Sequence, residues 1–146
     1  MSEKPDSGQT DRIEQALSFH LGQAHGTSNR HFTEIVATLG LTLKQVSALW
    51  LIADHPGLSQ MDLGQKLQMD RATTMGVVNR LQARGLIRRE KSTSDARKQA
   101  LHLEPEGEAA LVTARQAIRE HEAWLASRFT AAERDMLAEL LGRLHH

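Results

Sequence analysis

The sequence predicts a mainly α-helical domain that carries one small β-hairpin. Apolar residues recur at three- to four-residue steps along most of the chain, which is the period of a helix. The pattern changes between residues 86 and 103, where two short strand-like runs flank a polar turn. With 146 residues, the chain has the length of one ordinary domain. It contains no cysteine, which excludes disulfides, thiolate metal sites and thiol catalysis.

Four helices are predicted before the hairpin, over about residues 11–39, 42–55, 59–67 and 70–84. Three of them begin at a residue whose side chain accepts hydrogen bonds from free backbone N–H groups: Thr42, Ser59 and Asp70. Gly40 and Gly85 end the first and the fourth helix, because glycine readily adopts the left-handed conformation that follows a helix.

A hairpin and two further helices complete the predicted order. The strands are expected at residues 86–91 and 99–103, and the helices over about 105–127 and from Thr130 onward. Apolar residues recur at helical spacing near the end of the chain, namely Leu125, Phe129, Met136, Leu137, Leu140, Leu141 and Leu144. The first and last helices therefore either fold back on the core of their own subunit or pair with a second copy.

Positive charge is concentrated in one third of a neutral chain. Residues 66–98 contain nine basic and three acidic residues, so this segment carries +6 and the rest of the chain carries −6. Such a segment is either a solvated face or a surface that binds a polyanion. The chain has two tryptophans, three phenylalanines and no tyrosine, which argues against a protein that stacks single-stranded bases on aromatic rings.

Two short helices joined by a tight turn and followed by a basic hairpin form a winged helix-turn-helix. A helix fits the major groove of duplex DNA, and a cationic hairpin can reach the neighbouring minor groove. In the helix over 70–84, Thr74, Val77, Val78 and Leu81 share one face, which we expect in the core. The alternative is an amphipathic surface helix that carries two arginines by chance.

The residues outside that core face are candidates for contacting DNA. On the helix they are Arg71, Ala72, Thr73, Met75, Asn79 and Arg80, and on the hairpin Arg88, Asp95, Arg97 and Lys98. Asp95 precedes Arg97 by two residues, so its carboxylate is expected to brace the guanidinium for insertion into a minor groove. The alternative is an exposed ion pair without function.

Histidines and arginines suggest a small-molecule site, and no metal site or catalytic site is predicted. The eight histidines do not form a metal-binding pair at helical spacing. His20 and His31 share the predicted inward stripe of the first helix, where they are core residues or line an effector pocket with Trp50. Arg12, Arg30 or Arg115 could then bind an effector carboxylate. No glycine-rich phosphate loop or nucleophile elbow is present, so we predict neither an enzyme nor a cofactor.

Several motifs resemble the MarR (multiple antibiotic resistance regulator) family, and the resemblance covers nearly the whole chain. They are Leu58-Ser59-Gln60, Met69-Asp70-Arg71-Ala72-Thr73-Thr74, Asn79-Arg80-Leu81, Gly85-Leu86-Ile87-Arg88-Arg89, Asp95-Ala96-Arg97 and Leu101-His102-Leu103. Two positions depart from the family pattern, because Met75 replaces a small polar residue and Gly76 a basic one.

The resemblance implies a homodimeric repressor that binds a pseudo-palindromic operator in duplex DNA. It implies one domain over residues 11–146, in which 42–104 form the winged helix-turn-helix and 11–39 and 105–146 the dimerisation helices. It further implies release from DNA by a small effector, often an aromatic acid or its coenzyme A thioester. The alternative is a ligand-binding helical dimer or a protein-interaction module without a DNA role.

The start of the chain predicts no export signal. Residues 1–10 are polar, mixed in charge and without an apolar anchor, so they are expected to form a disordered tail. The longest strongly apolar run, residues 49–53, is too short to span a bilayer. We therefore expect a cytoplasmic protein that has no membrane partner.

Overall fold

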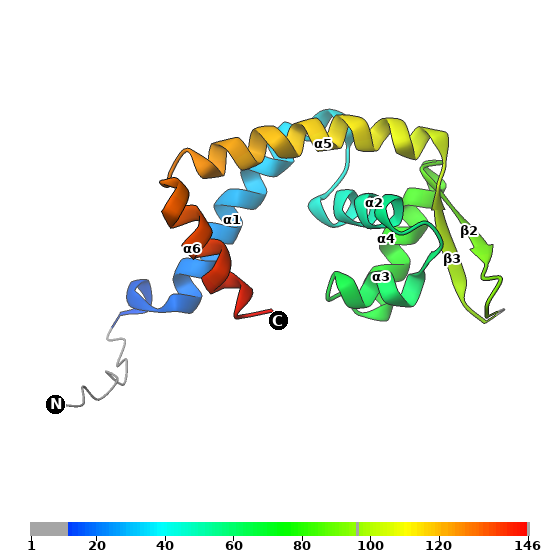
Figure 1. Ribbon diagram of the computed structural model, residues 1–146, viewed down its shortest axis with the longest axis horizontal. Helices are drawn as coiled ribbons and strands as arrows, with labels where there is room; N and C mark the ends of the chain where they lie inside the picture. The colour runs from blue at the N-terminus through cyan, green and yellow to red at the C-terminus, as the bar shows by residue number, and fades with distance from the viewer. Residues whose placement is uncertain (1–11, 96, 146) are drawn as a thin grey trace.

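The computed structural model describes residues 12–95 and 97–145, so the expected tail over 1–10 lies outside the described residues. Helices and a small sheet form the fold that the sequence predicts (Figure 1). The helices are α1 Leu17–Ile35, α2 Leu43–Asp54, α3 Gln60–Lys66, α4 Arg71–Ala83, α5 Pro105–Ala126 and α6 Ala131–Gly142. The strands are β1 Leu58–Ser59, β2 Ile87–Lys91 and β3 Gln99–Leu103, and short 3-10 helices cover Ile13–Gln15 and Ala37–Leu39.

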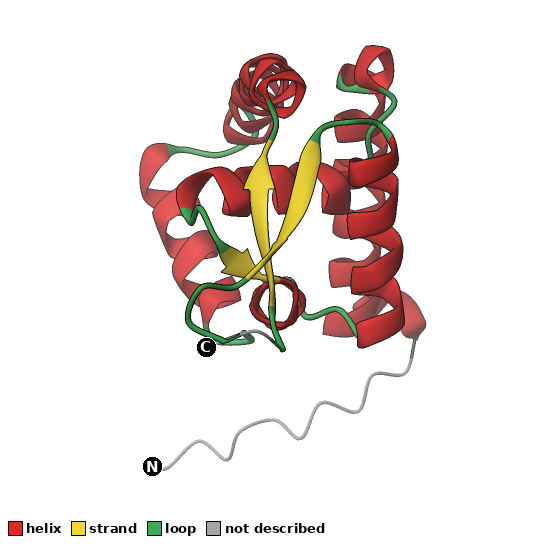
Figure 2. Cartoon of the chain, turned by 90° about the vertical axis from the view of Figure 1, so that its right-hand side faces the viewer, coloured by secondary structure: helices red, strands yellow, loops and turns green. Residues whose placement is uncertain are grey.

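The long helix α5 joins two parts of the molecule. In Figure 1 it runs above α2, α3 and α4 from the sheet at one end to α1 and α6 at the other. We call residues 41–111 the lobe, and α1, the second half of α5 and α6 the arm. Figure 2 views the lobe from its sheet side, with the strands in front of the helices.

The core of the lobe is built from one apolar face of each of its elements. Its least exposed large side chains include Leu49 and Ile52 of α2, Leu63 of α3, Leu81 of α4 and Leu101 of β3. Burial of such side chains stabilises a fold by about 1.5–3 kcal/mol each. The lobe therefore holds α4 and the hairpin in fixed relative positions.

The predicted helix caps are present, with one difference. Thr42 and Thr130 each form a full capping box, in which the side chains of Gln45 and Glu133 bond back to the cap backbone. Ser59 accepts a hydrogen bond of 3.0 Å from the backbone N–H of Asp62, without the reciprocal side-chain bond that completes a capping box. The aspartate side chain is one methylene shorter than the glutamate that a capping box normally uses.

The first predicted helix is interrupted. Ala16 is extended, with φ −74° and ψ 136°, so the 3-10 helix before it is separate from α1. At the other end α1 stops at Ile35, and buried Val36 leads into a second 3-10 helix that ends at Gly40, whose φ is 62°. Gly40 ends the helical segment as predicted.

A third strand, β1, was not predicted. It pairs antiparallel with β3, placing Leu58 opposite Leu101 and Ser59 opposite Ala100, and β2 pairs with the other edge of β3. Two residues are too few to show the alternation by which a strand is recognised in a sequence. The third strand ties the wing to the start of α3.

Close packing of α5 on the hairpin requires glycine at position 107. A Cβ atom there would collide with the carbonyl oxygen of Leu86 and lie 2.9 Å from its carbonyl carbon. The side chain of Leu103 is also near, at 3.3 Å. The first turn of α5 therefore rests directly on the backbone at the start of the wing.

Candidate nucleic-acid interface

Helix α4 is amphipathic in the sense that the sequence predicts. Thr74, Val77, Val78 and Leu81 are buried, while Arg71, Ala72, Thr73, Met75, Asn79 and Arg80 are exposed. Asp70 caps the helix by accepting a hydrogen bond of 2.7 Å from the backbone N–H of Thr73. This bond lowers the pKa of the Asp70 carboxyl below its usual value and keeps the cap charged.

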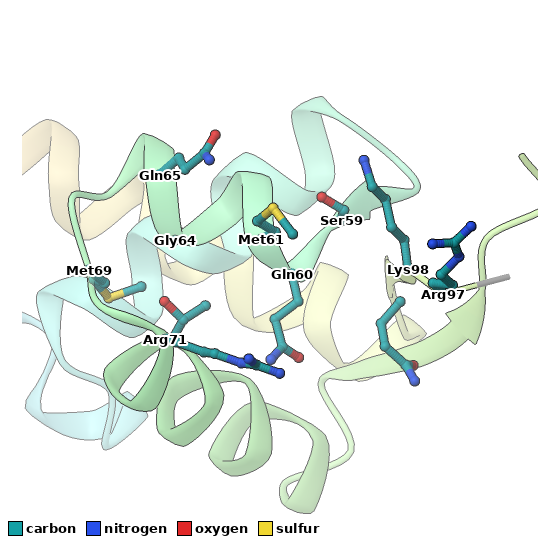
Figure 3. A pocket seen from close by; sticks show the side chains of 11 residues that line it. Ser59, Gln60, Met61, Gly64, Gln65, Met69, Arg71, Arg97 and Lys98 are labelled. Carbon is teal, nitrogen blue, oxygen red and sulfur yellow. The ribbon is translucent and has the colours of Figure 1, made fainter. Parts of the chain in front are cut away.

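A hollow of about 390 Å³ lies between α3, the start of α4 and the wing. Figure 3 shows Arg71 on one side of this hollow and Lys98 with Arg97 on the other. The lining also contains the amides of Gln60 and Gln65, which can donate hydrogen bonds. Three cations from two separate elements thus border one concave surface, which suits a ligand of repeated negative charge.

The wing tip is folded differently from the expectation about Asp95. Its carboxylate accepts a hydrogen bond of 3.0 Å from the backbone N–H of Arg97, and its backbone carbonyl accepts one from Lys98. The expectation that the carboxylate braces the guanidinium is therefore wrong in this structure, because a two-residue separation brings the backbone N–H within reach first. Arg97 is exposed. Ala96 lies outside the described residues.

Neighbouring arginines on β2 point to opposite faces of the hairpin, as strand geometry requires. Arg88 donates to the carboxylate of Glu90 at 2.7 Å and to that of Glu104 at 3.4 Å, and the Glu90 bond raises its pKa further. Its charge is compensated within the chain, and it does not line the hollow. Arg89 instead faces α4, where it bonds Asn79. Arg88 was a predicted DNA contact and Arg89 was not, although alternation along the strand separates the two.

Two of the predicted effector residues meet where α5 crosses α2. The guanidinium carbon of Arg115 lies 5.1 Å from the centre of the Trp50 ring, a cation–π distance. Its Nη2 atom is 3.9 Å from a carboxylate oxygen of Asp54. Within the described part of the chain, the buried Nε atom of Arg115 has no hydrogen-bond partner.

His31 belongs to a different cluster, between α1 and α5. Its Nδ1 atom is 2.8 Å from Nδ1 of His121, and its ring stacks on Trp124 at a centroid distance of 3.9 Å. Ser28 bonds the other ring nitrogen of His121 at 3.1 Å. Burial lowers the pKa of His121, and the nearby His31 lowers it further. His121 was not among the predicted site residues, because its burial depends on the crossing of two helices that are distant in sequence.

The remaining effector candidates lie apart from both clusters within one chain. Arg12 lies immediately before the 3-10 helix, and His20 lies in the first turn of α1. Both side chains are exposed. The expectation that His20 shares an inward stripe with His31 is wrong within one chain, because the side chain of His20 is exposed whereas that of His31 is half-buried. The structure thus brings Trp50 and Arg115 together and leaves the other candidates elsewhere.

Residues 12–95 and 97–145 hold no group of three or more histidine, aspartate or glutamate side chains that could bind a metal ion. Over the same residues, no helix has both the length and the apolar character required to cross a membrane.

Comparison with known proteins places this geometry in a family. A family model described as "MarR family" matches residues 39–98. A Thauera aromatica protein described as a transcriptional regulator of the hcr operon is 37% identical over 130 residues, which cover 88% of this chain and 78% of that protein. The homoprotocatechuate degradative operon repressor of Escherichia coli is 29% identical over 129 residues, covering 88% and 87%.

Solved structures agree with these sequence relatives. The transcriptional repressor CouR bound to a 23-mer DNA duplex superposes with a TM-score of 0.87 at 29% identity, covering 92% of this chain and 95% of that one. CouR bound to p-coumaroyl-CoA gives 0.83 at 28% identity, covering 90% and 92%. The chain therefore belongs to the MarR family of winged helix-turn-helix transcriptional regulators.

Proposed function

We propose that two copies of this chain bind one operator, each placing α4 in a major groove and its wing in the adjacent minor groove. The observation that carries this proposal is that Arg71, Arg97 and Lys98 all line one hollow beside the exposed face of α4. On that face Thr73 and Arg80 would contact phosphates, and Ala72, Met75 and Asn79 base edges. CouR, which shares this fold, is bound to a 23-mer DNA duplex, and this supports duplex DNA as the ligand.

The second copy would pair through the arm. The exposed apolar residues of α6 include Met136, Leu137, Leu140 and Leu141, and no residue of that helix is buried in a single chain. Apolar patches of this extent mark interfaces between subunits. Two-fold pairing would present two α4 helices to half-sites about 10–10.5 base pairs apart.

An effector would relieve repression by binding near Trp50 and Arg115. The indole offers an apolar face, and the unpartnered Nε of Arg115 offers a hydrogen bond to a carboxylate. One relative is the repressor of a homoprotocatechuate degradative operon, and another, CouR, is bound to p-coumaroyl-CoA; the two compounds are an aromatic acid and an aromatic thioester. We infer an aromatic acid or its coenzyme A thioester as the effector class for this chain. A thermal-shift screen of both classes tests it, with Arg115→Met expected to abolish the shift.

The regulatory role has no catalytic step, so we propose that the chain is not an enzyme. A protein that acts on chromosomal DNA in a bacterium would work in the cytoplasm. The competing function is a ligand-binding dimer without a DNA role. The exposed cations around the hollow favour DNA over that alternative, because a helical interaction module has no need for them.

Salt-dependent binding to duplexes tests this function. Duplexes enriched from a random library should bind with an affinity that falls steeply as salt rises, since counterions are released on binding. Arg97→Ala should weaken binding about tenfold and reduce the salt slope by about one. Arg119→Ala, which removes an exposed arginine of α5 that bonds only Gln116 among the described residues, is the matched control. An affinity that changes neither with the salt concentration nor on the Arg97→Ala substitution would contradict the proposal.

A further inference from the structure

One guanidinium group holds three side-chain amides. Arg89 of β2 donates from Nη2 to Oδ1 of Asn79 at 2.6 Å and from Nε to Oε1 of Gln60 at 3.2 Å. Its Nη1 donates to Oε1 of Gln82 in a short hydrogen bond. Asn79 and Gln82 belong to α4 and Gln60 to α3, so the cluster joins the wing to both helices of the helix-turn-helix.

The chemistry of the group fixes the direction in which each amide points. A guanidinium has five N–H donors and no acceptor, whereas an amide has an oxygen acceptor and an NH₂ donor. Rotating any of the three amides by half a turn would set N–H against N–H. All three oxygens must therefore face Arg89, and the NH₂ group of Asn79 faces away from it.

That direction matters because Asn79 is exposed on the face of α4 that we place in the major groove. A free asparagine can use both ends of its amide, as it does when it pairs with N6 and N7 of adenine. With its oxygen engaged by a cation, the amide acts chiefly as a donor. The matching acceptors in the major groove are N7 and O6 of guanine, N7 of adenine and O4 of thymine.

We propose that Arg89 is a positioning residue that sets the hydrogen-bonding sense of Asn79 and thereby selects the base that Asn79 reads. Arg89 itself need not touch DNA. Its half-buried position between β2 and α4 suits this role better than a phosphate contact. The inference rests on the proposed function, because it concerns how the same surface distinguishes operators.

The test measures base preference as well as affinity. Duplexes enriched by the full-length wild-type chain define an operator, and each position is then replaced by the other three bases. The base pair that Asn79 reads is the one at which the Asn79→Ala variant no longer prefers any base. At that position we expect the wild type to discriminate on the order of tenfold between the best and the worst base.

Arg89→Met keeps the length of the side chain and removes all donors. We expect it to reduce the discrimination at that position to about twofold or to raise the affinity for adenine there, with preferences elsewhere unchanged. Arg89→Lys keeps the charge but lacks the planar fork, and should show an intermediate loss. If Arg89→Met fails to fold, Arg89→Lys alone carries the test. The double variant Arg89→Met/Asn79→Ala should discriminate between bases at that position as weakly as Asn79→Ala alone, and no more weakly.

Arg88→Met is the matched control, since it removes the same charge from the opposite face of the strand. It should change affinity for all sequences by one factor. An Arg89→Met profile identical to the wild type, only shifted in affinity, would overturn the proposal and leave the proposed function intact. So would an Asn79→Ala variant that alters the preference at no position. A wild-type chain that enriches no sequence at all would instead refute the proposed function.

Discussion

The lobe and the arm differ in where their apolar residues lie. In the lobe, Leu49, Leu63, Val78 and Leu101 are fully buried by residues of the same chain. In the arm and the 3-10 helix that precedes it, Phe32 is buried, but many large apolar residues remain exposed, namely Ile13, Leu17, Leu21, Met136, Leu137, Leu140, Leu141 and Leu144. The lobe buries its apolar residues within one chain, whereas the arm leaves an apolar face for a second chain to cover. The comparison indicates that each chain forms its own DNA-contacting surface, whereas the distance between two such surfaces is set by the pairing of two chains.

The largest expected effect comes from a charge in the exposed stripe of α6. Leu140→Glu should prevent pairing, so sedimentation should show a monomer at concentrations where the wild type is a dimer. Affinity for a duplex with two half-sites should fall by at least about 100-fold, because the second contact is no longer intramolecular. Ala138→Glu, at an exposed position of α6 outside the stripe, should leave both properties intact. A dimeric Leu140→Glu protein with normal binding would show that the arm is not the interface.

A substitution at the start of α5, inside the lobe, should act on stability. Gly107→Ala places a methyl group against the backbone of Leu86, so we expect it to lower the free energy of unfolding by about 3 kcal/mol. Gly76→Ala is the contrasting change, because nothing lies within 4 Å of the added methyl on exposed α4. It should raise stability by about 0.5–1 kcal/mol. Chemical denaturation measures both, and equal effects would mean that α5 does not rest on the wing backbone.

The smallest expected effect is a pH dependence inside the arm. Burial lowers the pKa of His121 below the ordinary value of 6.5, so the unfolded chain binds that proton more tightly than the folded one. The stability is therefore complete above about pH 6.5 and decreases as the pH falls below it. His31 opposes protonation and Glu122 favours it. The wild type should lose more stability between pH 7 and pH 5 than His121→Gln, measured by denaturation at fixed protein concentration. Parallel curves would contradict this assignment.

Much of the lobe could be predicted because its signals are local. The caps at Thr42 and Asp70 and the buried face of α4 depend on residues close in sequence. The wing was recognisable from a change of period and its basic charge. These features also identified Arg71, Arg97 and Lys98, which the structure gathers around one hollow.

The features that could not be predicted depend on contacts between distant segments. Arg89 bonds Gln60, which is 29 positions away, and His31 meets His121 across 90 positions. Neither contact can be predicted from the residue spacing within a single segment. The error at His20 has the same origin, because a helical stripe shows which residues share a face but not how far along the helix a partner covers it. The expectation about Asp95 was wrong because its carboxylate accepts from the backbone N–H of Arg97 and not from the guanidinium of that residue.

The spacing of the two half-sites tests the central claim most directly. If paired chains present their α4 helices on one face of the duplex, the selected half-sites should be centred about 10–10.5 base pairs apart. Inserting five base pairs between them turns one half-site to the opposite face of the DNA, and affinity should then fall at least about 100-fold, toward that of a single half-site. Equal affinity for the original and the lengthened duplex would contradict the account.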